Sequence, residues 1–563
     1  MISSVAKPFL DVITYKLYNI ITYVLRGGKT YDAHVGITDN GGPMPTPQEK
    51  LAGSLEALKA LQDKGVVAIR ASDLSRTHRQ RLLKNGFIQE VMKGWYIPAK
   101  PDERAGDSTA WYASFLDFCA AYLRTRFGKN WCVSPEQSLS IHSGNLTIPS
   151  QLLVRTPNGG NKPTSLLYGT SIFDMRLNMP KEEDVVEQHG LRLLSLPAAL
   201  IDASPGFFAN NPTDARTALA MVADASDVVR RLLEGGHSAI AGRLAAAFRN
   251  IGRERIADDI VKAMRAAGYE IREQDPFRTR VDLNLPRREV SPYAGRIRLM
   301  WQQMRDAVIE QFPPSPGKPN DIDAYLKHVE EVYVTDAYNS LSIEGYRVSV
   351  ELIDRVRRGN WNPDTHEQDR KHADALAARG YWQAFQAVKK SVRAVLENKN
   401  SGTVADEDHG AWYRDMFAPS VTAGLIQAAS LAGYRNHPVY IRKSMHVPLP
   451  HHAVPDAMQA LFEMLENETQ PAVRVVLGHF VFVYIHPYMD GNGRMGRLLM
   501  NVMLAAGGYP WTIVPLERRD AYLAALEDAS TRQNITPFAQ FLGKLVQEAL
   551  EGKAVAKVPE ARS

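Results

Sequence analysis

The sequence predicts a multidomain, mainly α-helical protein with three principal units. The chain has 563 residues, 45% hydrophobic and 23% charged, which is typical of a soluble globular protein with about three or four domains. Residues 291–552 follow a helical hydrophobic pattern almost throughout, whereas the part before them mixes helical runs with short strand-like runs. We therefore expect a helical C-terminal domain preceded by two units that contain β-strands.

Residues 1–48 are expected to form an appended amphipathic helix and a linker. The stretch 9–25 is apolar and aromatic, but polar residues interrupt it, so it fits neither a membrane-spanning helix nor a signal peptide. We expect a cytoplasmic protein without membrane association. An oligomer contact such as a homodimer, or another partner contact, is one interpretation of this helix. Residues 27–46 lack a hydrophobic period and are typical of a flexible linker.

Residues 49–104 have the outline of a winged helix-turn-helix. Leucines recur at helical spacing from Leu51 to Leu61, and a second helix is expected over 76–85. Two short strand-like runs, 87–91 and 95–98, then flank a Lys-Gly turn and predict a β-hairpin. Helix, helix and hairpin in this order predict a DNA-binding module.

The second helix and the hairpin tip carry a basic surface, which favours double-stranded DNA as a partner. Its residues are Arg76, Arg79, Arg81, Lys84 and Lys93. The alternative is a solvated basic helix that packs on its own domain. The charge of the whole chain does not decide between them, because 67 Lys and Arg against 62 Asp and Glu leave only +5.

Residues 105–276 are predicted to form a middle domain of α/β or α+β class with a helical end. Strand-like runs cover 151–155 and 191–196. Helices are expected at 214–234, 238–249 and 255–267. A charged linker at 277–290 and a disordered tail at 553–563 complete the predicted organisation.

Two cysteines, Cys119 and Cys132, are too few to form a disulfide scaffold in a chain of this size. They do not form the Cys-x-x-Cys pair of a zinc site. We therefore interpret them as reduced thiols within the core, and the cysteine content excludes a disulfide-rich secreted class.

The most informative stretch is 486–497, His-Pro-Tyr-Met-Asp-Gly-Asn-Gly-Arg-Met-Gly-Arg. It lies between an apolar run, 475–485, and a predicted helix, 498–506. The N-terminus of a helix presents unpaired N–H groups and a partial positive charge, which suit a phosphate. Gly491 and Gly493 let the backbone approach an anion closely. This loop therefore predicts a nucleotide site.

The charged side chains of the loop suggest what each could do there. Arg494 and Arg497 offer charge-assisted hydrogen bonds to phosphate oxygens. Asp490 is a candidate ligand for Mg²⁺, which takes one or two carboxylates together with substrate phosphates. His486 is the candidate general base that takes a proton from an attacking hydroxyl.

Two other interpretations of the loop are open. Residues 491–496 also satisfy the dinucleotide-binding pattern G-x-G-x-x-G, with 481–485 and 511–514 as strands and Glu517 as the ribose ligand. Against it, the segment 486–490 separates the strand from the first glycine, and alternating strands are missing nearby. In the other interpretation the loop is structural, with Asp490 capping a helix and His486 buried in a core.

The motif 486–497 resembles the signature of Fic-domain proteins, His-Pro-Phe-x-(Asp/Glu)-Gly-Asn-Gly-(Arg/Lys)-x-x-Arg. It departs from the signature only at Tyr488, which keeps an aromatic ring. The resemblance implies an all-α Fic fold over 291–552 with a short β-hairpin flap. It also implies an enzyme that transfers AMP from ATP to a Ser, Thr or Tyr hydroxyl of a protein target.

The resemblance assigns a role to each position of the motif. His486 would be the base and Asp490 the Mg²⁺ ligand. Gly491, Asn492 and Gly493 would bind the α- and β-phosphates, Arg494 the β-phosphate side and Arg497 the γ-phosphate. Residues 439–450 are similar to the flap that docks a target peptide as an edge strand. Its expected contacts are Ile441, His446 and Pro448.

Residues 340–345, Ser-Leu-Ser-Ile-Glu-Gly, resemble the inhibitory motif of the same family, (Ser/Thr)-x-x-x-Glu-(Gly/Asn). The resemblance places an inhibitory helix near 335–346, on the N-terminal side of the domain, with Ser340 and Glu344 as its motif residues. It implies that Glu344 pairs with Arg497 and so displaces the γ-phosphate of ATP, because one guanidinium serves either anion. In some relatives such a Glu also supports removal of AMP, and this activity stays open here.

Residues 49–200 resemble AbiEi-type antitoxin and transcriptional-regulator domains. The matching stretches are 73–76, 82–88 and 94–98, followed more loosely by 152–157. The combined hypothesis is an AMP-transferase held in check by Glu344 and coupled to a DNA-binding module. The alternatives are a regulator that uses the C-terminal domain as a nucleotide sensor, a de-AMPylase and a transferase of another nucleotide.

Overall fold

The computed structural model describes residues 46–101, 107–278, 291–359, 373–553 and 556–558. The predicted N-terminal helix, nearly all of the linker 27–46 and most of the linker 277–290 lie outside these ranges. The described residues divide into two compact units. The first contains residues of Met1–Ile141, Leu146–Ser204 and Tyr440–Val447, and the second those of His142–Asn145, Pro205–Val439 and Pro448–Ser563.

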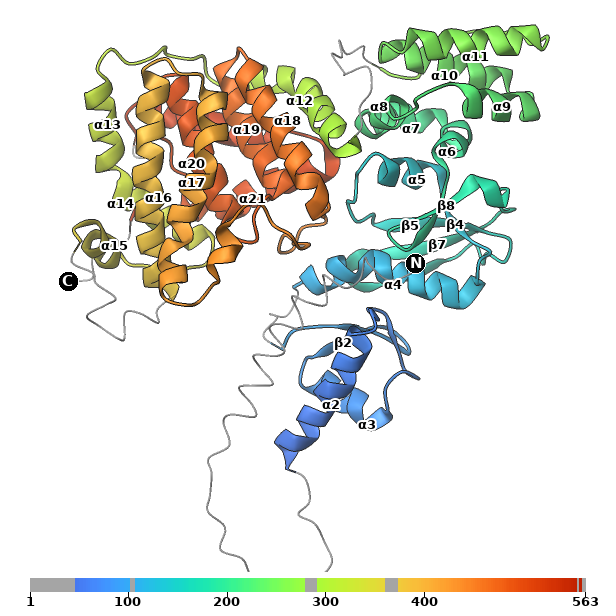
Figure 1. The fold of residues 1–563 in the computed structure, drawn as a ribbon, viewed down its shortest axis with the longest axis horizontal. Helices are drawn as coiled ribbons and strands as arrows, with labels where there is room; N and C mark the ends of the chain where they lie inside the picture. Colours follow the sequence, from blue (N-terminus) through green and yellow to red (C-terminus); the bar gives the residue numbers. More distant parts are fainter. Residues whose placement is uncertain (1–45, 102–106, 279–290, 360–372, 554–555, 559–563) are drawn as a thin grey trace, which may run out of the picture. The chain divides into compact units, whose positions relative to one another are not determined.

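The first unit begins with two helices and a small antiparallel sheet (Figure 1). The elements are α2 (Pro47–Gln62), β1 (Ile69–Arg70), α3 (Arg76–Lys84), β2 (Ile88–Met92) and β3 (Trp95–Pro98). The strand order is β1-β3-β2. Leu55 and Leu58 of α2 pack with Leu82 of α3 over the inner face of the sheet. These helices and the hairpin are the elements that the sequence predicts here.

The first unit continues with a mixed α/β arrangement. Its elements are α4 (Thr109–Phe127), β4 (Cys132–Val133), α5 (Pro135–His142), β5 (Gln151–Thr156), β6 (Pro163–Ser165), β7 (Ser171–Arg176), β8 (Val185–Gln188), β9 (Leu191–Leu194) and α6 (Leu196–Asp202). Strands β4-β5-β7-β6 form one sheet in which β5 and β7 are parallel, and β8 pairs with β9. Cys119 and Cys132 are free and buried, which confirms the interpretation of both as core thiols.

The helical end of the predicted middle domain belongs to the second unit instead. Its helices are α7 (Pro205–Asn210), α8 (Pro212–Ala220), α9 (Ser226–Gly235), α10 (Ser238–Asn250) and α11 (Glu254–Ala266). The single helix expected over 214–234 is wrong, because α8 ends at Ala220 and α9 begins at Ser226. In the connection between them the Asp224 carboxylate accepts the Ser226 N–H at 2.8 Å. Asp214 of α8 forms a buried ion pair with Arg296, which explains why α8 packs with the C-terminal helices.

The rest of the second unit is a bundle of helices, as predicted. They are α12 (Pro292–Gln311), α13 (Ile322–Glu331), α14 (Tyr333–Ile343), α15 (Val350–Arg357), α16 (Ala373–Leu396), α17 (Ser401–Thr422), α18 (Val454–Asn467), α19 (Pro471–Ile485), α20 (Asn492–Ala506), α21 (Arg519–Arg532) and α22 (Thr536–Leu550). Figure 1 shows α16, α17, α19 and α20 side by side, in agreement with their contacts. Leu498, Val502 and Leu504 of α20 are fully buried, so this helix lies inside the bundle. None of the helices that the structure describes is long and apolar enough to cross a membrane.

Three sequence expectations differ from this structure. Residues 433–450 form turns without a strand, so the expected hairpin flap is absent from this described segment. The dinucleotide-binding alternative is excluded, because 481–485 is helical and 511–514 is not a strand. Part of the tail that is expected to be disordered makes a defined contact, since the Asn339 side chain donates to the Lys557 carbonyl at 3.3 Å.

Candidate active site

The motif 486–497 is the turn between α19 and the N-terminus of α20. His486 ends α19 in a left-handed conformation, with φ 56° and ψ 60°. Gly491 precedes α20 at φ 80°, a backbone conformation that favours glycine. Gly493 lies in the first turn of α20, where an added Cβ would approach the Glu344 carboxylate to 2.3 Å. The two glycines therefore fit the backbone turn and the close approach of an acidic group.

Asn492 holds this turn together through its side chain. Its amide donates to the Tyr488 carbonyl at 2.8 Å and accepts the Tyr488 N–H at 2.9 Å. Only 2% of Asn492 is exposed. The resemblance assigns Asn492 to the phosphates, and in the structure one amide N–H and the amide oxygen also close the loop on Tyr488. The N-terminal backbone of α20 lies at the same turn and suits an anion.

Two hydrogen bonds hold His486, one at its ring and one at its backbone carbonyl. Its Nδ1 lies 3.2 Å from the Val483 carbonyl, which assigns the proton to Nδ1 and leaves Nε2 as a proton acceptor. Burial lowers the pKa of His486 to about 4, so the ring is neutral near pH 7. The Arg435 guanidinium donates to the His486 carbonyl at 2.7 Å. Nothing in the sequence predicts this contact, since Arg435 lies 51 residues before His486.

Arg497 is buried and bound on two sides by the end of α14. Its Nε donates to Ser340 Oγ at 2.9 Å, and its Nη2 donates to the Ser340 carbonyl at 3.0 Å and to Glu344 Oε1 at 2.7 Å. Arg497 has a side-chain exposure of 4% and Glu344 of 32%. Burial alone would raise the pKa of Glu344, but the charges of Arg497 and Arg494 and the hydrogen bond from Arg497 together outweigh it and keep that pKa below its usual value. The structure thus brings together the residues of two motifs that are far apart in sequence.

Asp490 and Arg494 lie on the other side of the same turn. Asp490 Oδ1 accepts the Gly491 N–H at 2.6 Å, and Oδ2 lies 3.5 Å from Arg494 Nη2. Two thirds of the Asp490 side chain is exposed, whereas only 1% of the Arg494 side chain is exposed. Asp490 therefore presents a carboxylate to solvent beside a buried cation.

The donor set at Asp490 fits Mg²⁺ only together with a phosphate ligand. Among the residues that the structure describes, His, Cys, Asp and Glu form no group of three that could hold a metal ion. A single exposed carboxylate is the kind of ligand that Mg²⁺ combines with substrate phosphates and water. Asp490 is consistent with that use.

The predicted flap contacts are not brought to an exposed edge. Residues Tyr440–Val447 cluster with the first unit. There the Ile148 N–H donates to the Met445 carbonyl at 2.9 Å, and Arg442 pairs with Asp107 at 2.8 Å. His446 and Pro448 are buried and Ile441 is half-buried, so this segment does not present the edge strand that was expected.

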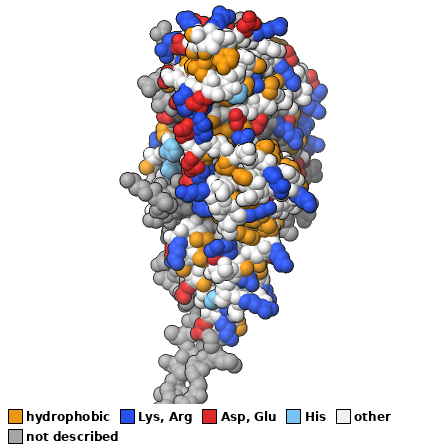
Figure 2. Space-filling model, turned by 90° about the vertical axis from the view of Figure 1, so that its right-hand side faces the viewer, with side chains coloured by type: hydrophobic (Ala, Val, Ile, Leu, Met, Phe, Trp, Pro, Cys, Tyr) orange, Lys and Arg blue, Asp and Glu red, His pale blue; other side chains and the backbone are white. Residues whose placement is uncertain are grey.

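The five predicted DNA contacts separate into two groups. Arg79 donates to the Ala71 carbonyl at 2.6 Å, and Arg81 donates to the Lys50 carbonyl at 2.8 Å, so both serve their own fold. Arg76, Lys84 and Lys93 are exposed. Figure 2 shows Lys and Arg side chains on the surface of this N-terminal part, next to the grey residues.

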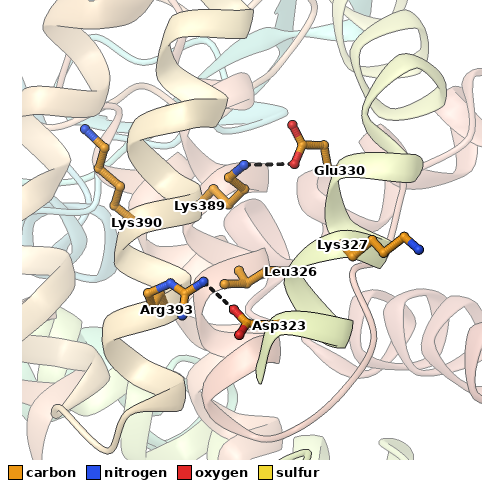
Figure 3. A pocket seen from close by; sticks show the side chains of 7 residues that line it. All are labelled: Asp323, Leu326, Lys327, Glu330, Lys389, Lys390 and Arg393. Atoms are coloured by element: carbon orange, nitrogen blue, oxygen red, sulfur yellow. Dashed lines mark hydrogen bonds and ion pairs between the residues drawn. The ribbon is translucent and has the colours of Figure 1, made fainter. Parts of the chain in front are cut away.

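A separate pocket of about 350 Å³ lies between α13 and α16. Figure 3 shows that two of its four cations are paired, Lys389 with Glu330 at 3.0 Å and Arg393 with Asp323 at 2.6 Å. Lys327 and Lys390 lie outside these pairs. None of the motif residues lines it. The turn between α19 and α20 is therefore the stronger candidate for chemistry.

Comparisons with known proteins point to the same turn. Residues 409–504 match the Fic/DOC family. The chain is 34% identical over 228 residues to a protein adenylyltransferase Fic of Drosophila willistoni, covering 39% of this chain and 42% of that protein. It is 28% identical over 236 residues to a protein of the same name from Culex quinquefasciatus, covering 41% and 43%. The chain thus spans about two fifths of the length of these curated relatives.

Solved structures with some likeness to this chain are also Fic proteins. A Fic-1 fragment from C. elegans has a TM-score of 0.34 at 18% identity, covering 58% of this chain and 91% of that one. A Fic domain containing signaling protein from Bacteroides thetaiotaomicron has a TM-score of 0.32 at 18% identity, covering 45% and 99%.

The neutral state of His486 can be measured without any substrate. In an NMR titration of protein with labelled histidine, with the signal assigned through His486→Ala, we expect no change of charge between pH 8 and pH 5, since burial holds the pKa at about 4. A midpoint near the ordinary histidine value of about 6.5 would contradict this description of the site.

Proposed function

We propose that the second unit is a protein AMP-transferase whose activity Glu344 inhibits. The observation that carries the proposal is the contact between Arg497 and Glu344, 2.7 Å long, beside a turn with a neutral histidine and an exposed carboxylate. The similarity of residues 409–504 to the Fic/DOC family and the adenylyltransferase names of the relatives support it.

The chemistry follows from the positions of the side chains. His486 Nε2 takes the proton of a Ser, Thr or Tyr hydroxyl on the target protein, and the hydroxyl oxygen attacks the α-phosphorus of ATP. The bond to the β-phosphate oxygen breaks, and pyrophosphate leaves with the electron pair. The backbone at the start of α20 and the guanidinium groups of Arg494 and Arg497 stabilise the negative charge on the phosphates. Mg²⁺ bound at Asp490 would supply further positive charge there.

The inhibition is a competition for one cation. Arg497 has its Nε and Nη2 engaged by Ser340 and Glu344, and its Nη1 is buried without a hydrogen-bond partner among the described residues. In our proposal the γ-phosphate takes the place of the carboxylate on this guanidinium. With the carboxylate in place, ATP either fails to bind or binds without its γ-phosphate on Arg497. Removing the Glu344 side chain takes the carboxylate away from Arg497, which keeps its hydrogen bonds to Ser340.

Transfer of AMP can be tested directly with α-labelled ATP and Mg²⁺, using the full chain alone and in a cell lysate. Glu344→Gly is expected to raise labelling of the protein or of a lysate target at least about tenfold, since Arg497 becomes free. Adding His486→Ala to that variant is expected to lower labelling by about 10²–10⁴-fold, because the base is lost.

Each alternative function has its own outcome in this experiment. No label in any variant, with ATP binding intact, would contradict the transferase and favour a nucleotide sensor. Labelling from UTP but not from ATP would indicate another donor nucleotide. Release of AMP from a labelled target in the wild type, lost in Glu344→Gly, would indicate the reverse reaction.

We propose DNA binding as a second function, located in the N-terminal helices and hairpin. The supporting observation is that Arg76 and Lys84, two turns apart on α3, and Lys93 at the hairpin tip are all exposed. They fit the arrangement by which a recognition helix and its wing meet the phosphates of a duplex. The resemblance of residues 49–200 to AbiEi-type regulators points the same way.

Helix α3 supplies both a test of DNA binding and its control, because two of its basic residues are exposed and two others bind their own fold. Replacing Arg76 and Lys84 by Ala is expected to weaken binding to the protein's own promoter and to reduce the slope of log affinity against log salt by about 2, because two phosphate contacts are lost. Replacing Arg79 and Arg81 is expected to lower the melting temperature instead, since both hold their own fold.

Fluorescence anisotropy over a range of salt concentrations and a thermal melt separate these effects. Unchanged affinity and unchanged slope in the Arg76/Lys84 variant would mean that this basic surface is only a solvated face of the helix.

A further inference from the structure

We propose that the ring of Tyr346 positions Arg494 for the nucleotide phosphates. The inference rests on the proposed nucleotide site and adds a residue from outside the motif 486–497. Tyr346 follows Glu344 and Gly345 directly after α14. The segment that supplies the inhibitory carboxylate therefore also supplies an aromatic partner for the other arginine of the motif.

Arg494 lies between two aromatic rings, with the Asp490 carboxylate 3.5 Å from its Nη2 and the Tyr346 hydroxyl as a further polar neighbour. Its Cζ lies 5.1 Å from the centroid of the Tyr346 ring and 5.1 Å from that of Phe417. Only 1% of its surface is exposed. Within the described residues its Nε and Nη2 are buried and make no hydrogen bond. A guanidinium that is buried with unused donors is prepared for an anion in the plane of its N–H groups.

Phe417 belongs to a row of rings that is fixed in the bundle. Phe417 and Tyr413 lie on α17 with ring centroids 5.0 Å apart. Tyr413 in turn stacks on Tyr488 of the motif at 3.7 Å, with 7° between the planes. The aromatic residue that departs from the family signature thus anchors the row, and Phe417 gives Arg494 a rigid contact on the side of α17.

Tyr346 gives the second contact from a different segment. Cation–π attraction offsets part of the cost of burying a guanidinium, and it acts on the faces of the group, which leaves the edge N–H groups for phosphate oxygens. Without the Tyr346 ring, Arg494 keeps Phe417 and the Asp490 carboxylate and has room to leave its position. The ring therefore sets how well Arg494 is placed when ATP enters.

This role predicts a dependence on the ring that a merely structural residue would not show. In the Glu344→Gly background we expect Tyr346→Ala to raise the Kd of ATP and the KM for ATP about tenfold while kcat changes less than about twofold. Tyr346→Leu keeps most of the buried apolar volume but has no ring, and should behave like Tyr346→Ala. Tyr346→Phe keeps the ring and should match its parent.

The measurements are ATP binding by calorimetry and initial rates of AMP transfer, with a thermal melt of each variant. Equal ATP affinity in all four proteins would overturn the inference, and so would a Phe variant as weak as the Ala variant. Calorimetry keeps this test separate from the proposed function. If the Glu344→Gly parent binds ATP but transfers no AMP, the transferase proposal fails while the role of Tyr346 is still decided by the Kd values.

Discussion

The buried positive charge of Arg497 is the constraint around which the site is arranged. A guanidinium with 4% side-chain exposure needs a partner, because an unpaired buried charge costs several kcal/mol. The end of α14 supplies that partner twice, as the Ser340 oxygens and as the Glu344 carboxylate. A nucleotide phosphate can take over the role of the carboxylate, so the same charge serves inhibition and, in our proposal, catalysis.

Several contacts hold α14 where it can reach Arg497. The Arg519 guanidinium donates to the Ile343 carbonyl at 2.8 Å, close to the end of the helix. One turn before Ser340, the Tyr381 hydroxyl donates to the Asp336 carboxylate at 2.7 Å, and burial raises the pKa of Asp336 to about 6. The Tyr381 contact holds the middle of α14, and the Arg519 contact holds its C-terminal end. Releasing it therefore requires either the loss of Glu344 or a ligand that competes for Arg497.

The sequence predicted the parts of the site that depend on local patterns. The turn at 486–497 and the short motif ending at Glu344 both carry their chemistry in consecutive residues, and the fold brings them into contact. The helical bundle followed from hydrophobic periodicity in the same way. The sequence does not predict the break between α8 and α9, because a local side-chain contact such as that of Asp224 with the Ser226 N–H leaves no trace in apolar spacing.

The contacts that sequence reasoning missed depend on tertiary structure. The amide of Asn492, a predicted phosphate ligand, also closes the turn on Tyr488. Arg79 and Arg81, predicted DNA contacts, both reach carbonyl groups of their own fold. In each case the residue type suits more than one use, and the internal contact depends on the position of a distant or neighbouring backbone group. The ring of Tyr346 beside Arg494 has no sequence signal for the same reason.

The central claim is that Glu344 and the γ-phosphate compete for Arg497, and the most direct test compares the binding of two nucleotides. Calorimetry with ATP and with ADP, each on the wild type and on Glu344→Gly, isolates the terminal phosphate. We predict that the substitution tightens ATP binding at least about tenfold and changes ADP binding by less than about twofold, since ADP has no γ-phosphate. An equal gain for both nucleotides, or no gain for ATP, would contradict the account.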